Sequence, residues 1–251
     1  SDLYAQLREK EVYNQGLFGF GITDGATPNA FNWGTDEVFN KLGAGRLSSS
    51  DGGVVTYRWK RCYEIISRAN YLLACMDLVD LSEEAKAKYS GETHFLRGLA
   101  YSVLAETYGG VPIILTNIST EEARSLKRAS LEETWQQALD DYEVAITNLG
   151  VDAPEPGRAT KGAALGMKMR AYLYQGKYKE VLACVEQIDA LKKYGLFHSY
   201  EGLFDPANEN NKEVLFDIQY IEGENSQGSY IDQYCGTGTG SWTRGDRKSV
   251  V

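Results

Sequence analysis

The sequence predicts an all-α fold built from tetratricopeptide-like helical hairpins, an α-solenoid with long loops and minor strand content. Apolar residues recur at helical spacing over several long stretches. N-cap residues precede these stretches, and Gly or Pro follows several of them. Residues 171–178 (AYLYQGKY) match part of the tetratricopeptide pattern. Two helices joined by a tight Gly turn would explain that match equally well, and they imply the same architecture.

The first quarter of the chain divides into a short helix and a long irregular segment. Residues 2–15 predict an amphipathic helix. Residues 16–56 hold neither a helical nor a strand period and are rich in Gly, Asn, Ser, Asp and Thr. Long irregular segments in compact domains are usually functional or mobile.

Two long helices are expected next. The first runs from Tyr57, with an apolar stripe made of Trp59, Cys62, Tyr63, Ile66, Ala69, Leu73 and Met76. The second follows Ser82, a predicted N-cap, and its apolar residues are Phe95, Leu96, Leu99, Val103 and Leu104. It should end at 108–112 (YGGVP), because Gly allows a left-handed C-cap and Pro blocks continuation.

The rest of the chain predicts a connector, three further helices and one strand. Residues 113–129 form the connector, and Ser130 with Glu133 has the spacing of a capping box. Apolar residues from Leu131 to Leu149 share one face of the helix behind that box. Thr160 caps the next helix, and Gly176 separates it from the last one, which carries Tyr178, Val181, Leu182, Val185 and Ile188. A loop covers 195–213, and residues 213–220 (EVLFDIQY) predict a strand.

Composition excludes several classes of protein. The chain has 251 residues, 43% of them hydrophobic, and a net charge of −9. It is therefore globular, and its charge argues against nucleic-acid binding. No apolar run approaches the length of a transmembrane helix. The four cysteines include no C-x-x-C pair and leave the compartment open.

Catalytic and cofactor motifs are missing from the sequence. The two histidines, His94 and His198, have no metal-ligand spacing, and no G-x-S-x-G occurs. The Gly-rich segment 236–240 lacks the Gly-Lys-Ser/Thr ending of a phosphate loop. We therefore expect no metal, no cofactor and no catalysis.

Five motifs follow one another along residues 57–220. They are Trp59-x3-Tyr63-x2-Ile66-x2-Ala69-Asn70; Glu92-x3-Leu96-Arg97-x3-Tyr101 ending in YGGVP; 128–133 (RASLEE); 157–178, from GRAT to YLYQGKY; and 211–216 (NKEVLF). In this order and spacing they resemble the SusD/RagB family.

The resemblance implies a location and a role. Members are lipoproteins exposed on the surface of a Gram-negative outer membrane, with tetratricopeptide-like hairpins supporting loops that bind glycans. They lie over a SusC-like, TonB-dependent transporter, deliver oligosaccharides and do not cleave them. The family's lipid is carried by an N-terminal Cys, so an anchor for this chain is expected upstream of Ser1; no other membrane contact is expected.

The resemblance also implies that the chain is a fragment. Residues 1–245 correspond to an incomplete N-terminal helical domain of the family. Residues 246–251 (DRKSVV) can be back-translated into a common sequencing adaptor read in frame. We expect this tail to be non-biological.

The glycan site is expected in the early irregular segment, where the family places its N-terminal contribution. Asp24, Asn32, Trp33 and Arg46 are the candidates. An indole ring can stack on the C–H face of a sugar, and planar polar groups bind its hydroxyls. Alternatively, Trp33 anchors the loop to the helices.

Two other functions compete with glycan uptake. A tetratricopeptide-type adaptor would bind protein or peptide partners, and a glycosidase would release reducing sugar. The 17 tyrosines could belong to the core or could form a surface on which sugars stack. Eight fall on predicted helices or at their ends, and most of these are expected to pack hairpins: Tyr63, Tyr71, Tyr101, Tyr108, Tyr142, Tyr172, Tyr174 and Tyr178. Phe31, Trp33, Tyr230, Tyr234 and Trp242 remain open to ligand.

Overall fold

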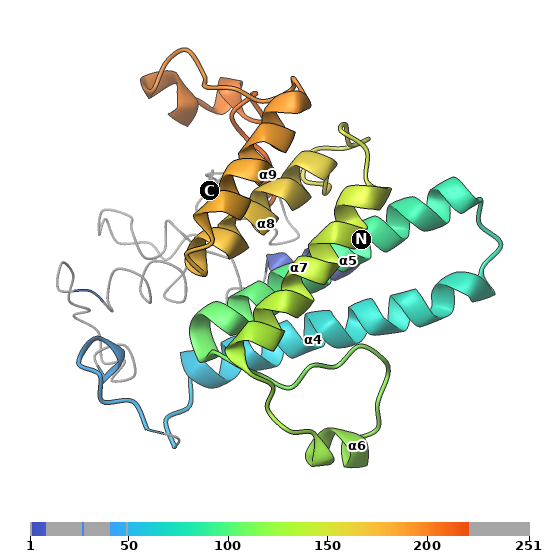
Figure 1. Cartoon of the computed structure of the whole chain (residues 1–251), viewed down its shortest axis with the longest axis vertical. Helices are drawn as coiled ribbons and strands as arrows, with labels where there is room; N and C mark the ends of the chain where they lie inside the picture. Colours follow the sequence, from blue (N-terminus) through green and yellow to red (C-terminus); the bar gives the residue numbers. More distant parts are fainter. Residues whose placement is uncertain (1, 9–26, 28–40, 49, 221–251) are drawn as a thin grey trace, which may run out of the picture. The chain divides into compact units, whose positions relative to one another are not determined.

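The computed structural model describes residues 2–8, 27, 41–48 and 50–220, and these residues form helices and irregular backbone without a strand (Figure 1). The chain divides into two compact units, Ser1–Arg61 with Ile218–Val251, and Cys62–Asp217. The predicted all-α class is confirmed.

Long helices make up most of the described structure. In chain order the elements are α1 (Asp2–Leu7), α4 (Val54–Cys75), η1 (Met76–Leu78), α5 (Glu83–Tyr108), α6 (Thr120–Ser125), α7 (Leu131–Asn148), α8 (Lys161–Tyr174), α9 (Tyr178–Ala190), η2 (Glu201–Phe204) and η3 (Pro206–Asn208). Helix α5 packs on α7, α7 on α8, and α8 on α9, so these four helices stack in chain order (Figure 1).

Helix α5 is the spine of the Cys62–Asp217 unit. The Ser82 hydroxyl caps its start by accepting a hydrogen bond from the Ala85 amide at 3.2 Å. Its middle is buried, including the predicted Phe95 and Leu96. The helix ends at Gly109, whose φ is +76°, a backbone angle that residues other than glycine rarely adopt. The predicted start and end of this helix are confirmed.

A buried polar network joins α4, α5 and α7. The Arg97 guanidinium donates through Nη2 and Nε to the Asp141 carboxylate at 2.7 and 3.0 Å, and through Nη1 to the Asn70 side-chain oxygen at 2.7 Å. His94 Nδ1 lies 2.8 Å from the same carboxylate. Arg97, Asp141 and Asn70 are all buried. A buried charge is tolerated only when it is paired, so these three helices must keep one register.

The same network fixes the chain that leaves α5. Asn70 Nδ2 donates to the Ile114 carbonyl at 3.0 Å, and the Tyr101 hydroxyl both donates to that carbonyl and accepts from the Ile114 amide. Tyr63 donates to the Pro112 carbonyl at 2.6 Å. Burial raises the pKa of Tyr101 to about 12, so its hydroxyl remains a donor at neutral pH. The polar residues of the first two motifs therefore anchor one loop.

Capping residues set the starts of α7 and α8. The Ser130 hydroxyl accepts from the Glu133 amide at 3.1 Å, and Glu133 Oε2 accepts from the Ser130 amide at 2.7 Å. Thr160 Oγ1 accepts from the Ala163 amide at 3.1 Å. The predicted capping box and the predicted Thr160 cap are both confirmed.

Two expectations about chain segments are wrong. The connector 113–129 contains the short helix α6, which Ser119 and Glu122 begin with their own capping box. The strand expected at 213–220 is turn and irregular backbone. Among the described residues this segment has no ladder partner, and its apolar side chains pack on helices instead. Phe216 meets Phe95 edge-on at 4.9 Å between ring centroids.

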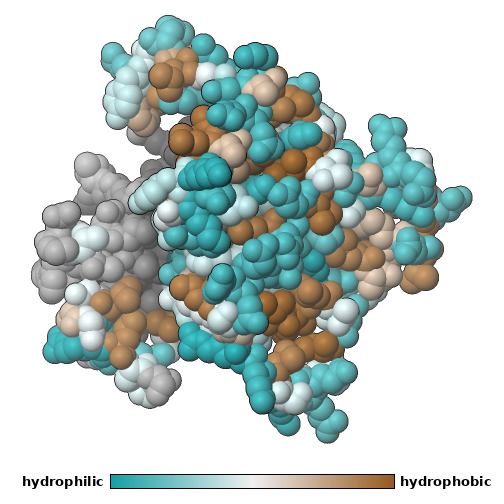
Figure 2. Space-filling model, viewed as in Figure 1, coloured by the Kyte–Doolittle hydropathy of each residue, from teal (hydrophilic) through white to brown (hydrophobic). Residues whose placement is uncertain are grey.

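The expectation for the tyrosines holds only in part. Tyr101 and Tyr142 are buried within the hairpins as predicted. Tyr71, Tyr174 and Tyr178 are largely exposed, so they are not among the tyrosines that pack the hairpins. Figure 2 shows apolar areas interspersed with hydrophilic ones on the face it draws.

Helix α9 also leaves much of its predicted apolar face uncovered. Its one buried residue is Cys184, whereas Leu182 is 64% exposed and Tyr178 is 68% exposed. Within the described chain, α9 is therefore packed on α8 through a narrow stripe.

A Gly110→Ala substitution should destabilise the protein by about 1–3 kcal/mol through overpacking. An added Cβ would lie 2.0 Å from the Ala129 carbonyl oxygen and 2.7 Å from the Ser130 carbonyl carbon, and both are backbone atoms that cannot move alone. Urea unfolding measures the effect. Gly195→Ala is the matched control, since its Cβ would meet nothing within 4 Å. Equal stability of the two variants would contradict this packing.

Candidate functional site

Of the four predicted glycan residues, the structure describes one. Asp24, Asn32 and Trp33 lie outside the described residues, as do Phe31, Tyr230, Tyr234 and Trp242. Arg46 is described and exposed. The structure therefore does not test whether the four come together.

Arg46 belongs to a tight loop that follows the residues around Lys41. Its amide donates to the Lys41 carbonyl at 2.7 Å. The preceding residue, Gly45, has φ at +65°, a backbone conformation that Gly adopts without strain. The turn thus presents the Arg46 side chain at the surface.

The carboxylate of Asp51 holds this loop together. Lys41 Nζ donates to Asp51 Oδ1 at 2.8 Å, and the Ser48 amide and hydroxyl donate to Oδ2 at 2.7 and 2.9 Å. The Lys41 hydrogen bond, followed by that of the Ser48 amide, lowers the pKa of Asp51 to about 2. The carboxylate is therefore ionised at any physiological pH.

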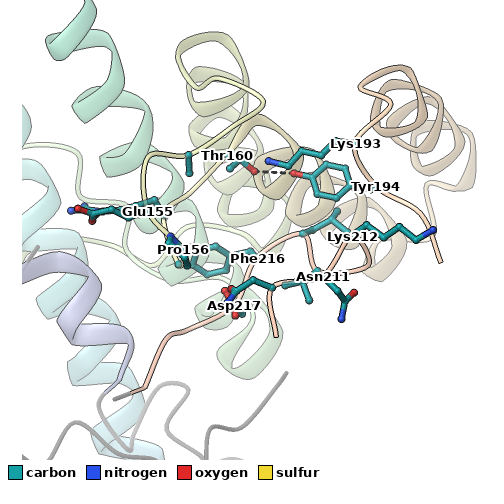
Figure 3. A pocket seen from close by; sticks show the side chains of 15 residues that line it. Glu155, Pro156, Thr160, Lys193, Tyr194, Asn211, Lys212, Phe216 and Asp217 are labelled. Atoms are coloured by element: carbon teal, nitrogen blue, oxygen red, sulfur yellow. Dashed lines mark hydrogen bonds and ion pairs between the residues drawn. The ribbon is translucent and has the colours of Figure 1, made fainter. Parts of the chain in front are cut away.

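A cavity of about 420 Å³ opens in the Cys62–Asp217 unit (Figure 3). Three stretches line it: the loop within 153–160 between α7 and α8, Lys193 and Tyr194 after α9, and residues 210–217. This cavity was not predicted from the sequence. A signal was present, because 157–160 and 211–216 belong to two of the five motifs.

Hydrogen bonds fix the Tyr194 side of the cavity. The hydroxyls of Tyr194 and Thr160 lie 3.1 Å apart, as the dashed line in Figure 3 shows. The ring lies against the backbone of Gly162, where an added Cβ would be 2.3 Å from it. The Gly195 amide donates to the Lys212 carbonyl at 3.1 Å. The first of the three stretches is thereby tied to the second, and the chain directly after the second is tied to the third.

Two cations at the cavity are neutralised by carboxylates. Arg158 Nη1 donates to Glu92 Oε2 at 3.0 Å, and its Nε lies 3.4 Å from Glu155. Lys193 Nζ donates to the Asp152 carboxylate at 2.9 Å. These ion pairs therefore hold the loop in place, and the carboxylates offset the positive charge of Arg158 and Lys193.

The described residues contain no cluster of three or more His, Cys, Asp or Glu side chains that could hold a metal ion. His94 is engaged with Asp141, and within the described chain Cys62 and Cys184 are buried and form no disulfide. In the described part of the chain, no helix is both long and apolar enough for a bilayer crossing.

Comparison with known proteins assigns the family. The SusD-like family model, described as starch-binding and associating with the outer membrane, matches residues 19–173, more than half of the chain. The chain belongs to the SusD-like family. This SusD-like chain is 26% identical to SusD-like protein P25 of Formosa agariphila over 244 residues, covering 90% of the chain and 45% of that protein. The chain thus spans less than half of this curated relative.

Solved SusD-like structures have the same fold. A SusD-like carbohydrate-binding protein of Bacteroides fragilis is 26% identical with a TM-score of 0.79, and the match covers 92% of this chain and 47% of that one. A laminarin-binding SusD-like protein, 22% identical, has a TM-score of 0.80 and matches 92% of this chain and 54% of its own. The latter shows likeness of fold alone.

The Asp51 contacts should persist far into acid. Because the folded-state pKa is lowered to about 2, they are complete above the ordinary Asp pKa of about 4 and are lost as pH falls through about 2. An NMR titration of the Ser48 amide should therefore have its midpoint near pH 2. A midpoint near 4 would contradict the hydrogen bonds from Lys41 and Ser48 to Asp51. The Asp51→Asn variant should show no titration of the Ser48 amide.

Proposed function

We propose that this protein is the glycan-binding component of an outer-membrane nutrient-uptake system. Family membership is the observation that carries the proposal, since the family model is described as starch-binding and associating with the outer membrane. Two of its structural relatives are named for carbohydrate or laminarin binding. The same function is expected from the sequence motifs.

Binding would use the two kinds of contact that sugars require. Trp33 would stack its indole on the apolar face of a sugar ring. The Arg46 guanidinium would donate to hydroxyls and ring oxygens, while Asn32 and Asp24 would accept from hydroxyl groups. The clamp formed by Lys41, Asp51 and Ser48 supports this assignment for Arg46, because a pre-formed loop lowers the entropy cost of binding.

The proposed action ends with binding and delivery. The protein would hold an oligosaccharide without cleaving it and pass it to a SusC-like, TonB-dependent transporter in the outer membrane. A lipid anchor would keep it at the cell surface. Co-purification of the full-length protein with a SusC-like barrel tests the partner.

A tetratricopeptide-type adaptor is the second candidate. The exposed apolar side chains of the α8–α9 hairpin, including Leu173, Tyr174 and Leu182, favour it, since such surfaces often bind protein partners. It predicts affinity for a protein or peptide and none for glycans. A glycosidase predicts release of reducing sugar. A glycan array with the full-length protein, followed by a reducing-sugar assay, separates the three.

Trp33→Ala and Arg46→Ala should each weaken binding of the glycan found on the array by at least about tenfold, equivalent to about 1.4 kcal/mol. Loss of stacking explains the first effect and loss of charged hydrogen bonds the second. Isothermal titration calorimetry measures both, with Lys179→Ala on exposed α9 surface as control. Unchanged affinity in both variants would reject this site, and absence of any glycan ligand on the array would reject the function.

A further inference from the structure

We infer that an exposed apolar stripe on α9, made of Tyr178, Leu182 and Val185, is covered in the full-length protein by a helix from outside residues 1–251. The inference builds on the expectation that these residues belong to a longer chain. It goes beyond the proposed glycan-binding function, because it assigns an interaction surface and depends on no ligand. These three residues are called the α9 stripe below.

The α9 stripe runs along one side of its helix. Its members follow one another at spacings of four and three residues, which places them on one face, and they are 68%, 64% and 37% exposed in chain order. The adjoining side of α9 faces α8, with Cys184 buried and Val181 and Ile188 partly buried. The apolar side of α9 is therefore wider than the part that α8 covers.

Polar side chains occupy the other side of α9. At 100° per residue, Glu180 and Gln187 lie opposite the α9 stripe, and both are exposed. A repeat at the end of a helical stack normally presents a polar outer face to water. Helix α9 is the last long helix in the described part of the chain, yet it presents apolar side chains there. Its pattern is that of a helix inside a stack, with a neighbour on each side.

The spacing within the α9 stripe favours a helix as the covering element. Apolar residues that alternate at four and three positions form the seam along which two helices pack at a crossing angle of about 20°. The described helices already stack in this order, α5 on α7, α7 on α8 and α8 on α9. A further helix on the α9 stripe would extend the stack by one layer.

The length of SusD-like proteins supplies a source for that helix. More than half of SusD-like protein P25 lies outside its match with this chain. The same holds for the solved carbohydrate-binding protein of Bacteroides fragilis. A full-length protein of similar size would therefore contain enough further chain for several helices.

The small size of the exposed face argues against a separate protein or a second copy of this chain. A stable interface between two proteins takes about 20–30 residues from each side. Even with Leu173 and Tyr174, which are exposed at the neighbouring end of α8, the α9 stripe falls well short of that number. A segment of the same chain needs less contact, because its tether gives it a high effective concentration. A covering segment of this kind would remove the surface that favours a tetratricopeptide-type adaptor.

Cysteine labelling of the full-length protein tests whether the α9 stripe is covered. Leu182→Cys should react with a maleimide at least tenfold more slowly than Gln187→Cys on the opposite side of α9, and both should react at the same rate after unfolding in urea. Site-resolved mass spectrometry is the readout, because the native Cys184 lies nearby. Equal rates in the folded protein would overturn the inference.

Photo-cross-linking identifies what covers the α9 stripe. Tyr178→p-benzoylphenylalanine keeps an aromatic side chain at this position and should form a cross-link within one chain, to a residue outside 1–251. A cross-link to a residue within 1–251 would overturn the inference, as would one to a second copy of the chain or to another protein.

This inference and the proposed function fail in different ways. Glycan binding on the array together with equal labelling rates would reject the covering helix and leave the proposed function standing. Protection of Leu182→Cys that requires an added protein would also reject the covering helix, and would favour the adaptor. Slow labelling without any glycan ligand on the array would reject the proposed function alone.

Discussion

The buried Arg97 guanidinium is the constraint on which the helical unit depends. It is paired with Asp141 on α7 and with Asn70 on α4, and His94 completes the set. Such a pair adds little net stability once its desolvation is counted, but separating it leaves a buried charge without compensation. Alternative registers of these helices are therefore costly, and the network selects one arrangement of the hairpins.

This arrangement leaves the loops between the helices to be ordered by polar contacts. Within the Cys62–Asp217 unit the helices hold three stretches around the cavity. Thr160 acts on two of these stretches, because its hydroxyl caps α8 and meets the Tyr194 hydroxyl. In the other unit, Asp51 plays the corresponding part for the loop of Arg46. Polar side chains thus order backbone that regular secondary structure leaves free.

Local signals in the sequence predicted most of the fold. Helix ends were predictable because they depend on short-range hydrogen bonds or backbone angles of single residues, and the residue type indicates these directly. The residues concerned are Ser82, Ser130, Thr160 and Gly109. The same rule applied to Ser119 would have found α6.

Features that depend on distant contacts were not predictable in this way. Residues 213–220 have the composition of a strand, yet strand formation needs a ladder partner, and Phe216 packs on Phe95 instead. The cavity depends on three separated stretches, so no single motif reveals it. Of the four residues predicted to bind glycan, only Arg46 lies in the described chain.

The most direct measurement of the role of the Arg97 network is a double-mutant cycle of Arg97→Met and Asp141→Asn, followed by urea unfolding. If the network governs the scaffold, each single variant loses about 3–5 kcal/mol and the coupling energy is about 2 kcal/mol or more. Losses that add to within about 0.5 kcal/mol would contradict it.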